Sequence, residues 1–309
     1  MVTRVTTSGN YANILANLLV AQQRQAEAGN KVATQKNGQN LKDYAKSSEL
    51  ITAMRSVQTR LVAFQDQNKL LKDKLSTQDT ALVRVADAAQ QVRQIFSDAL
   101  ASGRVDTLVE DVEAQLRNAA EAMNGRYGGK YLFAGGQVDT RPVTVTALTD
   151  LTAGPPISSF FKNDDFKVTA KLDEATTITT GLLASDIGTD MLTAFQTFQA
   201  FNQGAGGPFT GAMTAAQRTF LENQLATWDG VRSDVTILAA QNGTNQKRLE
   251  TVAEDLEGRN NSLAGMLGDI TDADMAEAAT QLEQAQFSVQ SAAYVLQALK
   301  DSSLINFLR

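Results

Sequence analysis

A run of 64 residues between Gly38 and Gly103 contains neither glycine nor proline. Both residues disfavour helix interiors, so the run favours one uninterrupted helix of about 90 Å. Within it, apolar residues recur in alternating steps of four and three. The positions of this seam are Leu50, Met54, Val57, Leu61, Phe64, Asn68, Leu71, Leu75, Gln78, Leu82, Val85, Ala89, Val92, Phe96 and Ala99. A 3.5-residue repeat sustained over this length predicts a supercoiled helix that packs along a partner helix.

A second helical arm lies toward the C-terminus and offers that partner. Its seam contains Val231, Val235, Leu238, Asn242, Asn245, Leu249, Val252, Leu256, Arg259, Leu263 and Met266. An antiparallel pairing would bury both apolar stripes and bring the two chain ends together. We therefore predict a mainly α fold, a long antiparallel helical rod or coiled-coil bundle formed by residues 41–137 and 182–268.

Four polar residues interrupt the two seams: Asn68, Gln78, Asn242 and Asn245. They are either tolerated near the surface of the rod or fix the register between its arms, as buried polar seam residues do in some coiled coils. The seam pattern does not distinguish these interpretations.

Residues 138–181 differ in texture from the arms. The stretches VTVTAL, FKVTAKL and ATTITT alternate apolar and polar residues of β-branched type, which predicts a small β-rich insert. Before it, an amphipathic helix ends at Asn124-Gly125, and the glycine-rich residues 125–136 predict a turn leading into a short hairpin. After it, a helix is expected through Met191, Leu192, Phe195, Phe198 and Phe201.

The two ends of the chain, residues 1–40 and 269–309, carry narrow apolar stripes on small-residue-rich helices. Such helices are marginal alone, so we predict a terminal assembly layer whose partners are, most simply, other copies of the protein. The candidate assembly contacts are Tyr11, Ile14, Leu18, Leu282, Val289, Leu296, Leu299, Ile305, Phe307 and Leu308.

Composition excludes several classes of function. The chain has no cysteine and no histidine, which removes disulfides, thiolate chemistry and the commonest metal ligands and general bases. The net charge is −6 and the sequence has no basic block, which argues against nucleic-acid binding. No apolar run reaches the roughly 18 residues that a membrane-spanning helix needs. We expect no cofactor, no metal and no enzymatic activity.

Two segments resemble ligand-binding loops but are better explained as a glycine turn and the start of a helix. The segment GRYGGK at residues 125–130 lacks the first glycine and the final Ser or Thr of a phosphate-binding loop. Asp269, Asp272 and Asp274 lack the central glycine and final glutamate of a calcium loop, and are expected to favour the start of a helix at about Asp274.

Four segments resemble the bacterial flagellin family, including its flagellin-like hook–filament junction members. They are Gln241–Glu250, Ile270–Glu277, the turn Gly129–Gly136 and the ending Leu304–Arg309. The turn and the ending are more similar to the junction members than to filament flagellins. The resemblance covers roughly residues 1–142 and 182–309.

The resemblance implies a structural subunit of the extracellular flagellum, secreted by type III export, that joins hook to filament by packing of its terminal helices. It also implies neighbouring hook-associated and flagellin subunits and an export chaperone as partners. A filament flagellin is an alternative, as is a secreted adhesin-like homologue that binds through residues 138–212.

Overall fold

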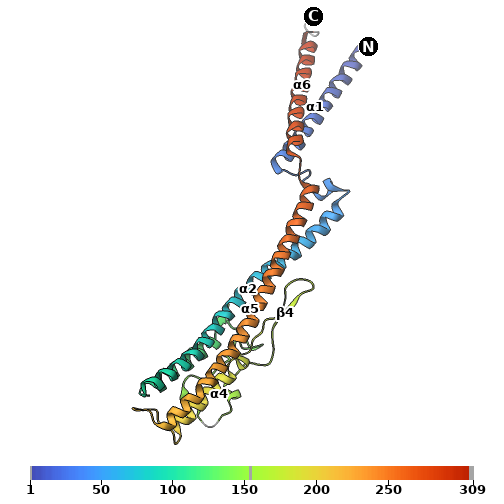
Figure 1. Ribbon diagram of the computed structural model, residues 1–309. Coiled ribbons are helices and arrows are strands. Elements are labelled where there is room, and N and C mark those ends of the chain that lie inside the picture. Colours follow the sequence, from blue (N-terminus) through green and yellow to red (C-terminus); the bar gives the residue numbers. More distant parts are fainter. Residues whose placement is uncertain (1, 153–154, 306–309) are drawn as a thin grey trace. The chain divides into compact units, whose positions relative to one another are not determined.

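The computed structural model of the chain describes residues 2–152 and 155–305, which are mainly α-helical (Figure 1). The α-helices are α1 (Val2–Thr34), α2 (Ser48–Ser102), α3 (Leu108–Met123), α4 (Ala184–Gln203), α5 (Ala215–Thr271) and α6 (Met275–Ile305). The strands are β1 (Arg126–Tyr127), β2 (Lys130–Tyr131), β3 (Thr169–Lys171) and β4 (Thr177–Thr179), and the short 3₁₀ helices are η1 (Leu41–Tyr44), η2 (Leu148–Leu151) and η3 (Ile157–Phe160). The predicted mainly α fold with a small β-containing region is confirmed.

The chain forms two compact units, each built from separate stretches of sequence. The first contains residues 1–60 and 259–309, and the second contains residues 61–258. Helices α2 and α5 contribute to both units. The sequence-based division at residues 40/41 and 268/269 lies inside the first unit and stays a prediction.

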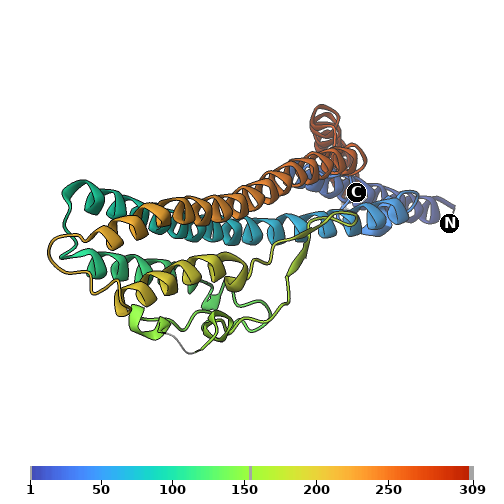
Figure 2. The same cartoon turned by 60° about the horizontal axis from the view of Figure 1, so that its bottom comes forward.

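In the second unit, α2 and α5 run antiparallel, with α3 and α4 as a second layer (Figure 2). Lys72 Nζ lies 3.1 Å from Glu250 Oε1, whereas Arg93 Nε lies 2.7 Å from Asp229 Oδ1, so the numbering rises along α2 as it falls along α5. The predicted antiparallel pairing of the two arms is confirmed here.

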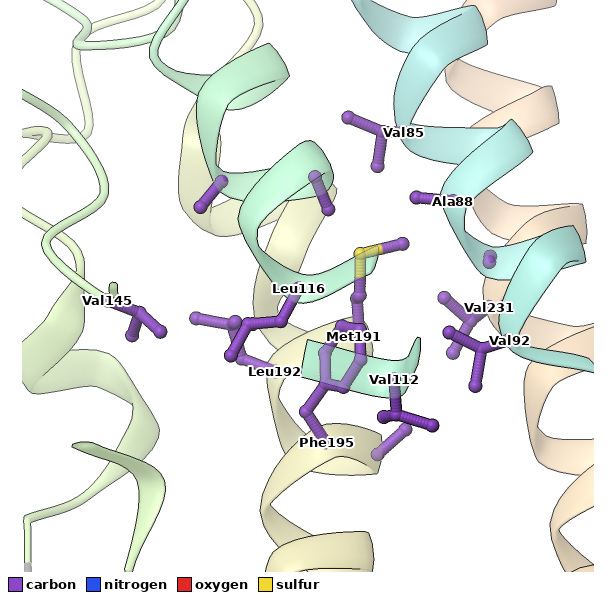
Figure 3. Packing of buried hydrophobic residues seen from close by; sticks show 14 of the residues in the cluster. Val85, Ala88, Val92, Val112, Leu116, Val145, Met191, Leu192, Phe195 and Val231 are labelled. Carbon is purple, nitrogen blue, oxygen red and sulfur yellow. The ribbon is translucent and has the colours of Figure 1, made fainter. Parts of the chain in front are cut away.

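The core of this bundle is a continuous apolar cluster. Figure 3 shows Val85 and Val92 of α2 facing Val112 of α3, Met191 of α4 and Val231 of α5. Nearby, an aromatic cluster fills the bundle with Phe96, Phe195, Phe198 and Trp228, and the Phe195 and Trp228 rings lie 4.8 Å apart edge to face. The residues of α2 that are buried in this core, from Ala81 to Ala99, lie in its C-terminal half.

Short strands occur at the predicted turn and in the insert. Strands β1 and β2 pair antiparallel around Gly128 and Gly129, whose φ angles of 57° and 82° fit a tight hairpin turn. In the insert, β3 pairs with β4 as predicted. The stretch Val143–Leu148 does not form a strand beyond one bridge from Val143 to Phe161, because its alternating apolar residues are buried by the bundle rather than by a sheet.

Polar seam residues dock the insert on the helices. The side-chain amide of Asn68 donates to the Leu172 carbonyl at 2.9 Å, that of Gln78 to the Thr180 carbonyl at 3.3 Å, and that of Asn245 to the Thr179 carbonyl at 2.9 Å. Beneath them, Leu75, Leu172, Ile178 and Leu249 form a small apolar cluster. The amides therefore satisfy carbonyls at the edges of the β3–β4 hairpin, which an apolar seam would leave unpaired.

One seam residue joins the two arms directly. Asn242 is buried on α5, and its amide donates to the Leu75 carbonyl of α2 at 2.9 Å. Gln246 donates to the same carbonyl at 3.1 Å. Of the two interpretations that the sequence left open, Asn242 supports register fixing, and Asn68 and Gln78 are buried rather than tolerated at the surface.

In the first unit, the start of α2 departs from the predicted seam. Leu50 is 51% exposed and Val57 is 38% exposed, whereas Ile51 is fully buried. The seam is therefore displaced by one residue at positions 50 and 57, whereas Met54 is half-buried as the repeat predicts. The displacement arises because a straight α-helix drifts relative to a 3.5-residue repeat, and the neighbours packed around this part of α2 select a different side.

Candidate assembly interface

Helices α1 and α6 pack against each other in the first unit, and Figure 1 shows them close together near their connections and spreading apart toward the two chain ends. Small residues lie at the centre of this contact, because Ala21 and Ala28 of α1 and Ala278 and Ala285 of α6 are buried. A methyl group added at Gly29 would lie 4.0 Å from Leu282 Cδ1, an ordinary van der Waals contact. The two helices thus meet along a narrow, close-packed seam.

The candidate assembly contacts that the structure describes lie on this seam. Ile14 and Leu18 on α1 and Leu282, Val289, Leu296 and Leu299 on α6 are half-buried. Phe307 and Leu308 and the side chains of Tyr11 and Ile305 lie outside the described residues. The structure therefore places the predicted α1 and α6 stripes toward each other within one chain. Their role between copies stays a prediction.

Other apolar residues of the same helices face away from the seam. On α6, Phe287 is 71% exposed and Tyr294 is 74% exposed, seven residues apart and half a turn from the seam positions. Leu15, Leu19, Val20 and Val295 are also exposed. We call these six residues the outer apolar face. A second apolar periodicity offset from the first was the sequence signal that could have revealed them.

Both helices lack charge where this face lies. Residues 5–23 and residues 284–299 contain no Asp, Glu, Lys or Arg. Charged residues are depleted from the cores of protein interfaces, because burying them has a large desolvation cost. The outer apolar face can therefore be covered by another protein surface without burying an ion.

The titratable groups outside this face form local contacts. Hydrogen bonding and charge from Lys72 lower the pKa of the Glu250 carboxyl, and a hydrogen bond from Lys36 lowers the pKa of Asp272. Hydrogen bonds from the Thr146 backbone and hydroxyl and from the Ala147 backbone lower the pKa of Asp150. Burial lowers the pKa of the Lys74 ammonium. None of these is a charge constellation suited to catalysis.

The described residues contain no group of three or more Asp or Glu side chains placed to hold a metal ion. Asp274 instead caps α6, because its carboxylate accepts hydrogen bonds from the backbone N–H groups of Ala276 at 2.9 Å and Glu277 at 3.2 Å. Among the helices in residues 2–152 and 155–305, none has an apolar stretch long enough to cross a membrane.

The two terminal helices, α1 and α6, thus pair with each other and carry uncharged stretches with an outer apolar face. Residues 225–308 match the family model of the bacterial flagellin C-terminal helical region. The match agrees with the resemblance found in this part of the sequence. No curated protein sequence matches the chain.

Two solved structures share its fold. One is a protein described as flagellar hook-associated, from Vibrio parahaemolyticus, with 15% identity and a TM-score of 0.61 over 74% of this chain and 100% of that one. The other is Bacillus cereus FlgL, with 13% identity and a TM-score of 0.53 over 71% of this chain and 99% of that one. At these identities the likeness concerns the fold.

Proposed function

We propose that this chain is a structural subunit of the bacterial flagellum that joins hook to filament by packing of its terminal helices. The observation that carries the proposal is the outer apolar face, which lies on uncharged parts of α1 and α6. The flagellin C-terminal helical region includes most of α6, so the exposed aromatic residues belong to the flagellin-like part of the chain.

Within the flagellum, a junction position is favoured over the filament. The turn at residues 129–136 and the ending Leu304–Arg309 resemble junction members, and two of the solved structures with a similar fold carry hook-associated or FlgL descriptions. The flagellin region itself supports the second candidate, a filament flagellin.

The proposal extends to location, export and partners. The subunit acts in the extracellular flagellum after type III export. It contacts other copies of itself, a neighbouring hook-associated protein and flagellin subunits, and an export chaperone holds it before assembly. The proposal assigns no catalytic role, cofactor or metal to the chain. Residues 138–181 act as a structural insert docked on the helices, which is the role that the hydrogen bonds of Asn68, Gln78 and Asn245 support.

The outer apolar face is tested by a double substitution, Phe287→Ser with Tyr294→Ser. Both side chains are largely exposed, so the monomer should keep its helix content and its thermal midpoint. Incorporation into flagella should be lost, because the neighbouring subunit then meets a polar surface. The matched control is Phe166→Ser, which removes an exposed phenylalanine from the second unit and should leave incorporation intact. Normal incorporation of the double variant would contradict the proposal.

Junction and filament subunits differ in self-propagation. A junction subunit meets different proteins on its two sides, so the purified chain seeded with its own fragments should not elongate. Deletion of its gene should leave hooks intact while flagellin is lost to the medium. Growth of micrometre-long filaments from the purified chain alone would replace the junction assignment with the filament candidate.

A further inference from the structure

Two connections within the first unit are bound to each other. One leads from the end of α1 at Thr34 toward α2, and the other joins α5 to α6. The Asn37 backbone N–H donates to the Thr271 carbonyl at 2.8 Å, and the Ala273 N–H donates to the Gln35 carbonyl at 3.0 Å. Gln35 has a φ of 56°, a left-handed conformation that is uncommon for a residue with a side chain. The chain adopts it where the two connections pair.

The Tyr44 hydroxyl lies between these connections. It accepts a hydrogen bond from the Gly38 N–H at 2.8 Å, and its proton lies within reach of the Gly38 carbonyl at 2.9 Å and the Thr271 carbonyl at 3.1 Å. Tyr44 is half-buried at the end of η1. The Tyr44 hydroxyl oxygen therefore contacts the backbone of both connections, which are more than 200 residues apart in sequence.

Further contacts join the same segments but are more exposed. Lys36 forms an ion pair with Asp272, and both side chains are about half exposed, so the pair contributes little in water. The Asn37 side chain donates to the Asp272 carbonyl at 2.7 Å. The Thr271 hydroxyl is buried, but its bond across the connections is a long one, accepted from Lys36 Nζ at 3.4 Å. The half-buried Tyr44 hydroxyl makes shorter contacts, at 2.8 to 3.1 Å, and we expect it to matter most.

The α1–α6 seam by itself specifies its register poorly. Its fully buried residues are alanines that repeat every seven residues on both helices, and its larger residues, such as Ile14 and Leu282, are only half-buried. A side-chain hydrogen bond between the described parts of the two helices is a long one, from Lys31 Nζ to Gln281 Oε1 at 3.5 Å. Helices with flat, small-residue seams slide past one another at low cost unless something outside the seam holds them.

We propose that the Tyr44 hydroxyl is a positioning group that holds the two connections together and thereby sets the register of α1 against α6. Fixing this register also fixes which residues of the two helices form the outer apolar face. Only the role of that face in flagellar assembly rests on the proposed function. The register itself is a property of the isolated chain.

The test is chemical cross-linking of introduced cysteine pairs, which is direct because the chain has no cysteine. The Lys31→Cys with Gln281→Cys pair reports the α1–α6 register. The Lys72→Cys with Glu250→Cys pair reports the α2–α5 contact in the second unit, where the ends of the native side chains lie 3.1 Å apart. Because these contacts join the ends of long side chains, each pair is trapped with a short bismaleimide in dilute protein, and the initial rate of cross-linking is measured with and without Tyr44→Phe.

Tyr44→Phe removes one oxygen atom and keeps the ring. It should slow trapping of the 31–281 pair about twofold while leaving the 72–250 pair unchanged. A loss of about 1.4 kcal/mol lowers the equilibrium constant for the native register about tenfold, but the fraction in register falls less because that register is the main state. The matched control is Tyr127→Phe, which removes a hydroxyl that donates to the Leu70 carbonyl in the second unit. It should leave the 31–281 rate unchanged.

Three results would overturn the proposal: an unchanged 31–281 rate in Tyr44→Phe, equal slowing of both cysteine pairs, or equal slowing by Tyr127→Phe. The outcome is independent of flagellar assembly. If Tyr44 sets the trapping rate but the native chain does not enter flagella, the positioning role stands and the proposed function fails. If trapping does not depend on Tyr44 but the chain assembles normally, the reverse holds.

Discussion

Replacing Asn68 with leucine should destabilise the protein, although the substitution completes an apolar seam. The side chain is 1% exposed, and its amide nitrogen donates to the Leu172 carbonyl at 2.9 Å. Leucine of similar size leaves that carbonyl without its donor, and a buried unpaired polar group costs about 1–3 kcal/mol.

Two effects offset part of this loss. Asn68 Oδ1 is buried and has no hydrogen-bond partner among the described residues, so its removal relieves an existing cost. The leucine also adds apolar contact near the cluster of Leu75, Leu172, Ile178 and Leu249. We therefore expect a net loss at the lower end of the range, about 1 kcal/mol, or a fall of about 2–4 °C in the thermal midpoint.

The assay is thermal unfolding followed by circular dichroism, together with hydrogen exchange of the β3–β4 amides. The matched control is Gln67→Leu, because Gln67 is exposed and donates to the adjacent Lys171 carbonyl at a long 3.4 Å. This control should change stability by less than about 0.5 kcal/mol. A raised thermal midpoint in Asn68→Leu, with unchanged exchange at β3–β4, would refute the reasoning.

Three further predictions concern other sites. Gly188→Ala should destabilise the second unit by about 1–3 kcal/mol in denaturant unfolding, because the new Cβ would lie 2.6 Å from Met123 Sδ. The control Gly243→Ala, whose new Cβ would have nothing within 4 Å, should stabilise α5 by up to about 1 kcal/mol. The pKa of the Asp150 carboxyl is lowered in the fold, so the ionised carboxylate stabilises the folded state. This stabilisation is complete above the unfolded pKa of about 3.9 and is lost as the pH falls through the folded pKa. Asp150→Asn should therefore flatten the curve of unfolding free energy against pH below about pH 4. Deleting Leu304–Arg309 should abolish flagellar incorporation while leaving the far-ultraviolet circular dichroism of the monomer nearly unchanged.

Helix content and pairing direction were accessible from the sequence. The absence of glycine and proline over residues 39–102 and the spacing of apolar residues predicted α2, which extends from Ser48 to Ser102. Local rules sufficed here, because propensity and periodicity act over a few turns. The same rules predicted the Gly128-Gly129 turn, where positive φ angles require glycine.

The roles of individual seam residues required the tertiary structure. Asn68 appears as a polar interruption in the sequence, but its partner is a carbonyl 104 residues away in the insert. Leu50 fits the repeat better than Ile51, yet the packing around α2 buries Ile51 and exposes Leu50. Periodicity identifies an apolar stripe, whereas its orientation depends on which neighbours cover it.

For the candidate assembly interface, too, the sequence determined some features and the tertiary structure the others. Sequence determined that both chain ends are amphipathic helices with charge-free stretches at residues 5–23 and 284–299, because charge and spacing are local properties. Only the tertiary structure decided that Ile14, Leu18 and Leu282 lie on the α1–α6 seam and that Phe287 and Tyr294 remain exposed. The physical reason is that burial depends on contacts between residues about 250 positions apart, and no local pattern specifies which of two apolar stripes such a contact covers.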